Sequence, residues 1–458
     1  MNRSLPRLLI AGTGSGVGKT TFTAGLCRAL VRRGLNVAVF KCGPDYLDPT
    51  YHRLASGRTV HNLDGWLMGR NAVRDTFTRN AASADISLIE GVMGLFDGAD
   101  PRSLSGSSAE IAMWLDTPCV LVCDAHGMAR SVAAVAHGFA RFEPDVQVRA
   151  LICNRLGSQG HLELLRRAEH DVPVYGGLLR DVEHAFPERH LGLRTADEIA
   201  PGAAFDAFAD QIEANCDVER LLALARSAPQ LAMPETDSTP KHATRQAACR
   251  IGVARDEAFH FYYDSNLRLL ERAGARLIEF SPLRDRALPD IDGVYIGGGY
   301  PELHAAALAT NTDMLHALRE LAARGAPFYA ECGGLMYLST AIQTHNGERH
   351  EMLGLIDGCA IMTERLQALG YVEVETRSAG PLGPAGTRFR GHQFRHSRLE
   401  SGAPAHVYTM TIVRNSQVAL EGYGSDNIVA SYVHAHWASN PSIARAFVAR
   451  CVATRSTP

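Results

Sequence analysis

The stretch that decides the fold is Leu8-Leu9-Ile10-Ala11-Gly12-Thr13-Gly14-Ser15-Gly16-Val17-Gly18-Lys19-Thr20. Leu8–Ala11 is typical of a buried strand, and Thr20–Arg33 of a helix with Gly34 at its C-terminal cap. Between them, small residues let successive backbone N–H groups turn toward anionic oxygens, and the lysine adds positive charge. The glycine that usually opens this kind of loop is displaced by one position to Gly12. The sequence therefore predicts a phosphate-binding loop and a nucleotide site.

Short β-rich segments alternate with helical patterns through the first half of the chain, which predicts a parallel sheet flanked by helices. Each expected strand ends in a polar or charged residue, as functional residues at the carboxyl edge of such a sheet would. The strands expected after the first are Asn36–Lys41, Ile86–Glu90, Val120–Asp124 and Val148–Asn154.

The pattern changes between residues 227 and 249, where Pro, Ser, Thr, Glu and Gln are frequent, as in an interdomain linker. A second alternating series follows. Its expected elements are the strands Ile251–Ala254, Arg276–Phe280, Gly293–Ile296 and Pro327–Ala330, and the helix Asn266–Ala273. Because 458 residues exceed one core of ordinary size, more than one domain is expected. We predict a nucleotide domain over residues 1–226, a linker over 227–249 and a second α/β domain over 250–458.

Carboxylates are concentrated in two segments that follow the second and third strands, Phe40–His52 and Ile89–Gly98. Carboxylates at a sheet edge beside a triphosphate most simply hold Mg²⁺, which needs hard oxygen ligands. Any single one of them could instead be a solvated loop acid or a helix cap. The expected magnesium ligands are Thr20, Asp45, Glu90 and Asp97.

A cysteine in a glycine-rich turn marks the second domain, where Ala330-Glu331-Cys332-Gly333-Gly334 leaves a strand and opens a helix. Such a turn exposes the sulfur at a positive helix end, which we expect to lower the pKa of the thiol. Glutamine hydrolysis needs a thiolate, a base and N–H donors for the oxyanion. Cys332 is the expected nucleophile, and the expected donors are Gly298, Gly299 and Gly333.

The expected base is His434, in the stretch Ala430-Ser431-Tyr432-Val433-His434-Ala435-His436-Trp437. His434 and His436 could instead be structural or bind a metal, although zinc would require two more well-spaced donors, and none is evident. Catalysis is the favoured reading for His434 alone. Most of the ten cysteines are expected to be buried thiols in a reducing cytoplasm.

Composition excludes several classes of function. A formal net charge of -3, with no long run of one sign, indicates neither a nucleic-acid footprint nor a polybasic membrane anchor. Met1–Arg7 lacks the apolar stretch of a secretory signal, and no apolar run approaches the length of a membrane span. A cytoplasmic protein is expected.

The Phe40–His52 segment resembles the signature of the corrin a,c-diamide synthases, which amidate cobyrinate or hydrogenobyrinate in cobalamin synthesis. The first domain is similar to dethiobiotin synthetase, which shares the Gly-Thr-x-x-x-Val-Gly-Lys-Thr loop, and the second resembles class I glutamine amidotransferases. Cobyric acid synthase carries a Lys-Pro-Gln-Asn-Met-type segment where this chain has Lys41-Cys42-Gly43-Pro44-Asp45. The resemblance, which runs through both domains, therefore favours the diamide synthases.

This resemblance implies ATP- and glutamine-dependent amidation of the a and c acetates of a corrin acid, through an acyl phosphate and ammonia released from glutamine. It implies Mg²⁺, substrate contacts for Tyr46 and Asp48, charge stabilisation by Lys19 and Lys41, and adenine recognition by Asn154. The residues expected to bind ATP are Gly12, Thr13, Gly14, Gly16, Val17, Gly18, Lys19, Thr20, Thr21, Lys41 and Asn154.

Several alternatives stay open. The second domain has His436 where class I enzymes place an acid, so the residue that orients His434 is unassigned. Gly391-His392-Gln393-Phe394 resembles a Gly-His-Glu-Phe-type motif, with a structural role at least as plausible as binding. The corrin could arrive with or without cobalt, and cobyric acid or a nickel-bearing sirohydrochlorin are other substrates of the same chemistry. A non-enzymatic P-loop ATPase switch and a homodimeric assembly also stay open.

Overall fold

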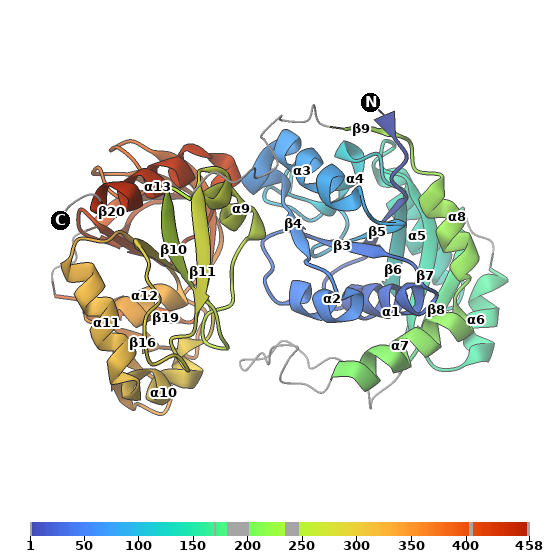
Figure 1. The fold of residues 1–458 in the computed structure, drawn as a ribbon. Coiled ribbons are helices and arrows are strands. Elements are labelled where there is room, and N and C mark those ends of the chain that lie inside the picture. Colours follow the sequence, from blue (N-terminus) through green and yellow to red (C-terminus); the bar gives the residue numbers. More distant parts are fainter. Residues whose placement is uncertain (1, 169–170, 181–200, 234–246, 403–405, 456–458) are drawn as a thin grey trace. The chain divides into compact units, whose positions relative to one another are not determined.

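The computed structural model describes residues 2–168, 171–180, 201–233, 247–402 and 406–455. The chain forms two compact units, Met1–Thr239 and Pro240–Pro458 (Figure 1). Residues 234–246 of the expected linker lie outside the described residues. Just before them, β9 (Leu231–Ala232) pairs antiparallel with β1 (Asn2–Arg3), so this end of the expected linker packs as part of the first unit.

The first unit contains a seven-stranded sheet in which all neighbouring strands are parallel. In spatial order its strands are β4 (His61–Leu63), β3 (Val37–Cys42), β5 (Ile86–Glu90), β2 (Arg7–Gly12), β6 (Cys119–Asp124), β7 (Val148–Leu156) and β8 (Val174–Leu179). The parallel sheet predicted for this half is confirmed. The two outermost strands, β4 and β8, were not predicted, because β4 has only three residues, two of them polar, and β8 has two glycines in its middle.

Helices cover both faces of this sheet, with α1, α2 and α7 on one side of β3 and α3 and α4 on the other (Figure 1). The apolar residues Phe22, Leu26 and Leu30 recur every four positions on α1 and are buried in the core that includes residues of α7. Helix α1 ends as predicted, since Gly34 has φ 82° and its N–H donates to Val31 O. The helices of the unit are α1 (Lys19–Arg32), α2 (Asp48–Ser56), α3 (Gly65–Ala81), α4 (Ser108–Trp114), α5 (Ser131–Phe142), α6 (Gln159–Arg166), α7 (Pro201–Asn215) and α8 (Val218–Arg226).

The second unit is built on a ten-stranded mixed sheet. Its parallel part has the order β11 (Ala275–Phe280), β10 (Cys249–Ala254), β12 (Gly293–Ile296), β13 (Phe328–Glu331) and β22 (Ile428–Ser431). It continues through antiparallel pairings to β21 (Val418–Gly424), β20 (His406–Ile412), β17 (Ala368–Thr376), β18 (Arg388–Arg395) and β23 (His434–His436). The strands β11, β10, β12 and β13 match the predicted ones to within two residues at either end, whereas β22 and the antiparallel half of the sheet were not predicted.

A smaller four-stranded sheet and five α-helices complete the described part of the second unit. The sheet has the order β15 (Arg349–Glu351), β14 (Ser339–Gln343), β16 (Ile356–Met362) and β19 (Ser397–Glu400). The helices are α9 (Asp264–Arg272), α10 (Ala305–Thr310), α11 (Thr312–Ala323), α12 (Gly333–Leu338) and α13 (Ser442–Arg455), with 3₁₀ turns at Pro301–His304 and Trp437–Ser439. In the described ranges, no helix combines the length and the apolar character that a membrane span requires. All ten cysteines are free thiols and eight of them are buried, as predicted.

Candidate active sites

The glycine-rich loop joins β2 to α1 and wraps around its own lysine. Lys19 Nζ donates to Gly14 O at 2.9 Å. Gly16 and Gly18 have φ of 73° and 96°. Residues with a Cβ rarely adopt such positive φ, so glycine is favoured at both positions. The expected nucleotide-binding residues from Gly12 to Thr21 thus lie in one continuous loop and the first turn of α1.

Asn154 contacts this loop from the end of β7. Its Nδ2 donates to Val17 O at 2.8 Å, and a Cβ on Gly18 would lie only 1.9 Å from that nitrogen. Its neighbour Arg155 was not predicted, although one guanidinium nitrogen donates to Gly16 O at 3.0 Å and another to Asp124 Oδ2 at 2.6 Å. The only signal in the sequence was the position of Arg155 next to Asn154.

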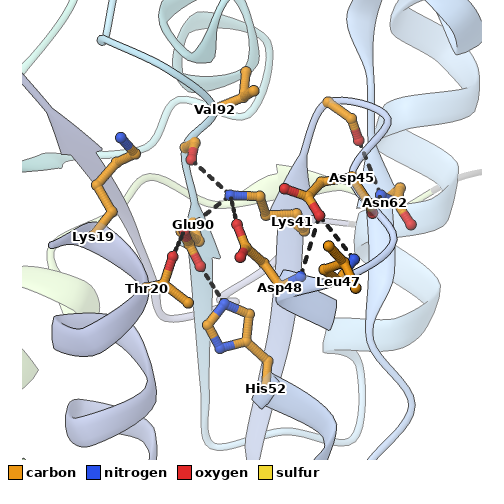
Figure 2. A network of polar contacts seen from close by, with 12 residues as sticks. Lys19, Thr20, Lys41, Asp45, Leu47, Asp48, His52, Asn62, Glu90 and Val92 are labelled. Carbon is orange, nitrogen blue, oxygen red and sulfur yellow. Dashed lines mark hydrogen bonds and ion pairs between the residues drawn. The ribbon is translucent and has the colours of Figure 1, made fainter. Parts of the chain in front are cut away.

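A buried charge network lies at the carboxyl ends of β3 and β5 (Figure 2). Lys41 and Glu90 are register partners on these strands, and Lys41 Nζ lies 2.9 Å from Glu90 Oε1 and 2.7 Å from Asp48 Oδ2. Lys41 also donates to Gly91 O at 3.1 Å. Glu90 Oε1 accepts from the hydroxyl of Thr20 at 2.8 Å, which connects the network to the phosphate loop.

The charges in this network stabilise one another. Burial by itself would lower the pKa of Lys41, but the carboxylates of Asp48 and Glu90 raise it above its ordinary value. Burial by itself would raise the pKa of Glu90, but the ammonium of Lys41 holds it below its ordinary value. Lys41 and Glu90 are therefore an ion pair inside the protein.

The segment between β3 and α2 carries the residues expected at the substrate carboxylate. Asp45 Oδ1 accepts from Leu47 N at 2.8 Å and from Asp48 N at 3.2 Å, so it caps the first turn of α2. Asn62 donates to the carbonyls of Gly43 and Asp45 and fixes the loop from the other side (Figure 2). The structure thus gives Asp45 a capping role and pairs Asp48 with Lys41, while Tyr46 lies half-buried on the same loop.

His52 completes the network and was not predicted. It lies one helical turn after Asp48 on α2, is 0 % exposed, and its Nε2 contacts Glu90 Oε2 (Figure 2). A carboxylate only accepts hydrogen bonds, so Nε2 carries the hydrogen. The signal was the i, i+4 spacing of Asp48 and His52, which places both side chains on one face of α2.

The donor set fits Mg²⁺ held together with a nucleotide. Mg²⁺ is usually bound through one or two carboxylates together with substrate phosphates. Thr20 and Glu90 bring a hydroxyl and a carboxylate oxygen together beside the phosphate loop. Within the described ranges, no three His, Cys, Asp or Glu side chains are grouped to bind a metal alone. Asp97 is exposed and accepts from Gly94 N at 2.8 Å, in a segment tied to the loop by Leu95 N donating to Gly12 O.

The cysteine of the second unit lies on a strained turn between β13 and α12. Cys332 has φ 49° and ψ −101°, outside the conformations that a residue with a Cβ prefers. Its backbone N–H donates to Ser431 O at 2.7 Å, which joins the turn to the end of β22. The sulfur lies 4.0 Å from Phe394 O and is partly accessible. This strand–turn–helix geometry matches the one expected from the sequence.

The expectation that the helix end lowers the pKa of Cys332 was wrong. Burial raises the pKa of this thiol to about 12, and the charge of Glu302 adds to the rise, while Arg395 opposes it. Helix α12 has only six residues, so the field at its N-terminus is too weak to offset the loss of solvent. Burial also lowers the pKa of His434 to about 3. The resting pair is therefore a neutral thiol and a neutral imidazole.

The loop after β12 lies against both the histidine and the cysteine turn. A Cβ on Gly298 would lie 2.5 Å from His434 Cε1, and a Cβ on Gly333 would lie 3.0 Å from Gly299 N. The Gly298 N–H already donates to Phe261 O at 3.3 Å. Gly299 and Gly333 therefore remain the candidate oxyanion donors, and the structure brings them side by side.

Comparison with known proteins gives the family. Residues 8–193 match the CobQ/CobB/MinD/ParA nucleotide binding domain, and residues 250–442 match the CobB/CobQ-like glutamine amidotransferase domain. A cobyrinate a,c-diamide synthase of Leptospira interrogans serogroup Icterohaemorrhagiae serovar copenhageni is 49% identical over 99% of this chain and 100% of its own length. The chain belongs to the cobyrinate a,c-diamide synthase family. Other members are that of Syntrophotalea carbinolica, 49% identical over 98% of this chain and 99% of its own, and that of Priestia megaterium, 41% identical over 98% of each.

Membership in this family confirms the predicted resemblance and the predicted class of enzyme, an amidating ligase with a nucleotide-binding half and a glutamine amidotransferase half. Each half contains one of the two sites described above. The charge network lies wholly in the first unit, and Cys332 and His434 lie wholly in the second.

Proposed function

We propose that this chain amidates the a and c acetate carboxylates of a corrin acid, cobyrinate or hydrogenobyrinate, with ATP as the energy source and glutamine as the nitrogen donor. The observation that carries the proposal is the identity of 41–49% over nearly the whole chain to relatives named cobyrinate a,c-diamide synthase. The nucleotide domain would extend through β9, which pairs with β1, and the glutaminase domain would be residues 250–458.

In the first domain, an acetate oxygen attacks the γ-phosphorus of ATP, and ADP leaves. The step is needed because a carboxylate is a poor electrophile until one oxygen becomes a leaving group. The phosphate loop from Gly12 to Thr21 binds the phosphates, and Lys19 and Lys41 stabilise the charge that develops on the transferred group. Tyr46 and Asp48 contact the substrate carboxylate, and Asn154 recognises adenine.

Thr20 and Glu90 would hold Mg²⁺. Asp45 and Asp97 are the two further carboxylates expected to contribute to the metal site. When bound, Mg²⁺ supplies charge shielding to the phosphates. The chain contributes the orientation: Lys41 and His52 fix the Glu90 carboxylate so that Oε1 faces Thr20. Glu90 therefore needs no rearrangement to present an oxygen beside the phosphate loop.

In the second domain, His434 takes the proton of Cys332 as the sulfur attacks the glutamine amide. His434 gives this proton to the amide nitrogen, which leaves as ammonia, and water then hydrolyses the thioester to glutamate. The amides of Gly299 and Gly333 donate to the oxyanion. Ammonia then attacks the acyl phosphate, and inorganic phosphate leaves.

One assay tests the reaction and its substrate together. The protein is incubated with ATP, Mg²⁺, glutamine and either cobyrinate or hydrogenobyrinate, and mass spectrometry counts the added amides. Two amides on one of these acids is the expected result. The same incubation is repeated with the precursor of cobyric acid and with a nickel-bearing sirohydrochlorin. Amidation of one of these alone would reassign the substrate, and glutamine left intact in every incubation would favour a P-loop ATPase switch.

The Cys332→Ala variant tests the division of labour. It should lose all glutamine-dependent product and keep product formation from free ammonia, because the acyl phosphate is made without the cysteine. Loss of both activities in a folded protein would contradict two separate sites.

A further inference from the structure

Glu331 is a buried carboxylate that the reaction above does not use. It is the last residue of β13, immediately before Cys332, and is 0 % exposed. Its Oε1 accepts from the Tyr329 hydroxyl at 2.6 Å and from Ala435 N at 3.0 Å, and its Oε2 accepts from the Tyr295 hydroxyl at 3.1 Å. Burial of a carboxylate that is not paired with a cation costs free energy, so the position of Glu331 calls for a structural or functional explanation.

The reason lies in the strand that carries the histidine. β23 is the last strand in the order of the sheet and pairs on one edge with β18, where His434 faces His392. Its other edge is buried, and side chains take the place of a neighbouring strand. Glu331 accepts from Ala435 N, and Asn266 donates to Ala435 O at 2.8 Å and accepts from Trp437 N at 2.9 Å. Buried backbone groups require such partners.

A second carboxylate holds the same chain segment just before the histidine. Glu421 accepts from the Ser431 hydroxyl at 2.5 Å and from Tyr432 N at 2.8 Å. His434 is thus bracketed by Glu421 on one side and Glu331 on the other. Only Glu331 is also adjacent in sequence to the nucleophile, so it connects the strand of Cys332 directly to the strand of His434.

We propose that Glu331 is a positioning residue for glutamine hydrolysis: by accepting the Ala435 N–H, it fixes the base His434 relative to the nucleophile Cys332. The inference rests on the proposed roles of Cys332 and His434. Glu331 is bonded in the chain directly to Cys332. Its side chain accepts the N–H of Ala435, the residue that follows His434. Displacement of a catalytic group by about 1 Å can cost on the order of 10²-fold in rate.

Two substitutions of matched size separate hydrogen bonding from packing. Glu331→Met fills the same space but accepts no strong hydrogen bond, whereas Glu331→Gln keeps an acceptor for Ala435. We expect kcat for glutamate release to fall about 10²-fold in Glu331→Met, with KM for glutamine little changed, and to recover in Glu331→Gln. Hydrogen exchange at the Ala435 amide should accelerate in Glu331→Met alone. Tyr329→Phe is the control, because it removes a donor to Glu331 but leaves the Ala435 bond.

Hydrogen exchange at the amides of β10 and β12, in the core of the second unit, reports whether each variant is folded. A folded Glu331→Met enzyme with unchanged kcat overturns the proposal, and so does a Glu331→Gln enzyme that is as slow as Glu331→Met. If the second unit of Glu331→Met does not fold, Glu331→Asp replaces it, because the shorter side chain cannot reach Ala435 and the same fall in kcat is expected. A failure of the proposed function is distinct, since wild-type protein would then release no glutamate at all.

Discussion

Lys41 and Glu90 face each other across two neighbouring parallel strands, and their side chains form an ion pair at the edge of the first sheet, 2.9 Å apart. Their positions follow directly from the strand register, because parallel strands present their carboxyl ends at the same edge. Glu90 contacts Thr20 of the phosphate loop, and Lys41 contacts Asp48 at the start of α2. The pair therefore connects the loop to α2.

Lys41→Met removes the ammonium that lies between Asp48 and Glu90. Both buried carboxylates lose this ion pair, so we expect a loss of about 3–5 kcal/mol in the free energy of unfolding, measured in urea. Amidation from free ammonia should disappear, while glutamate release by the second unit continues. Arg28→Met breaks the exposed Arg28–Asp206 pair and serves as the control, with a loss under about 1 kcal/mol.

Gly298→Ala places a methyl group 2.5 Å from the present position of His434 Cε1. The ring must move, so we expect kcat for glutamate release to fall by about 10²-fold with ammonia-dependent amidation intact. Gly402→Ala is the matched control, because no atom of the described residues lies within 4 Å of its added Cβ. Equal rates in the two variants would contradict the placement of His434 at this loop.

Asn154→Ala removes the side-chain amide that donates to Val17 O in the phosphate loop. We expect a higher KM for ATP because the loop loses one of its fixed contacts. If Asn154 also reads adenine, the preference for ATP over GTP should fall in the same variant, and steady-state kinetics with both nucleotides measures it. An unchanged preference would limit Asn154 to supporting the loop.

Three buried histidines of the second unit should reduce its stability in mild acid, whereas Glu331 and Glu302, whose pKa burial raises to about 7, contribute in the opposite sense. Burial lowers the pKa of His436 to about 3, that of His434 to about 3 and that of His392 to about 4. Their usual value is about 6.5, so the unfolded chain binds more protons between pH 6.5 and these values, and the native state loses stability as the pH falls through that window.

His436→Gln tests this contribution, since glutamine does not titrate. Urea unfolding measured between about pH 7 and pH 4 should show a shallower decline for the variant than for the wild type. The Tyr263 and His436 ring centroids lie 4.6 Å apart, and Arg390 is the cross-strand partner of His436. If the free energy of unfolding falls equally with pH in both proteins, His436 does not account for the loss of stability in acid.

The sequence was sufficient for features that depend on local pattern. The phosphate loop, the parallel strands and the turn at Cys332 each combine a strand with a glycine-rich turn, and the structure has all three. Lys41 and Glu90 were placed at one edge because both end a predicted parallel strand. The folding of each half into an α/β unit follows from the same alternation.

Features that depend on contacts between distant segments were missed. The antiparallel strand β18 does alternate, with Phe389, Gly391 and Gln393 buried, but its charged residues concealed the pattern. His52 and Glu331 gain their roles only from the partners that the fold brings to them. The predicted direction of the pKa shift of Cys332 was wrong for the same reason. The helix end is visible in the sequence, but the burial of the sulfur depends on distant segments.

The network at the first sheet edge holds two carboxylates around a single ammonium. The two carboxylates exceed the charge of the ammonium between them, so a nucleotide that brings a divalent cation is attracted to this edge of the sheet. In the proposed reaction we therefore expect the nucleotide to bind before the corrin acid.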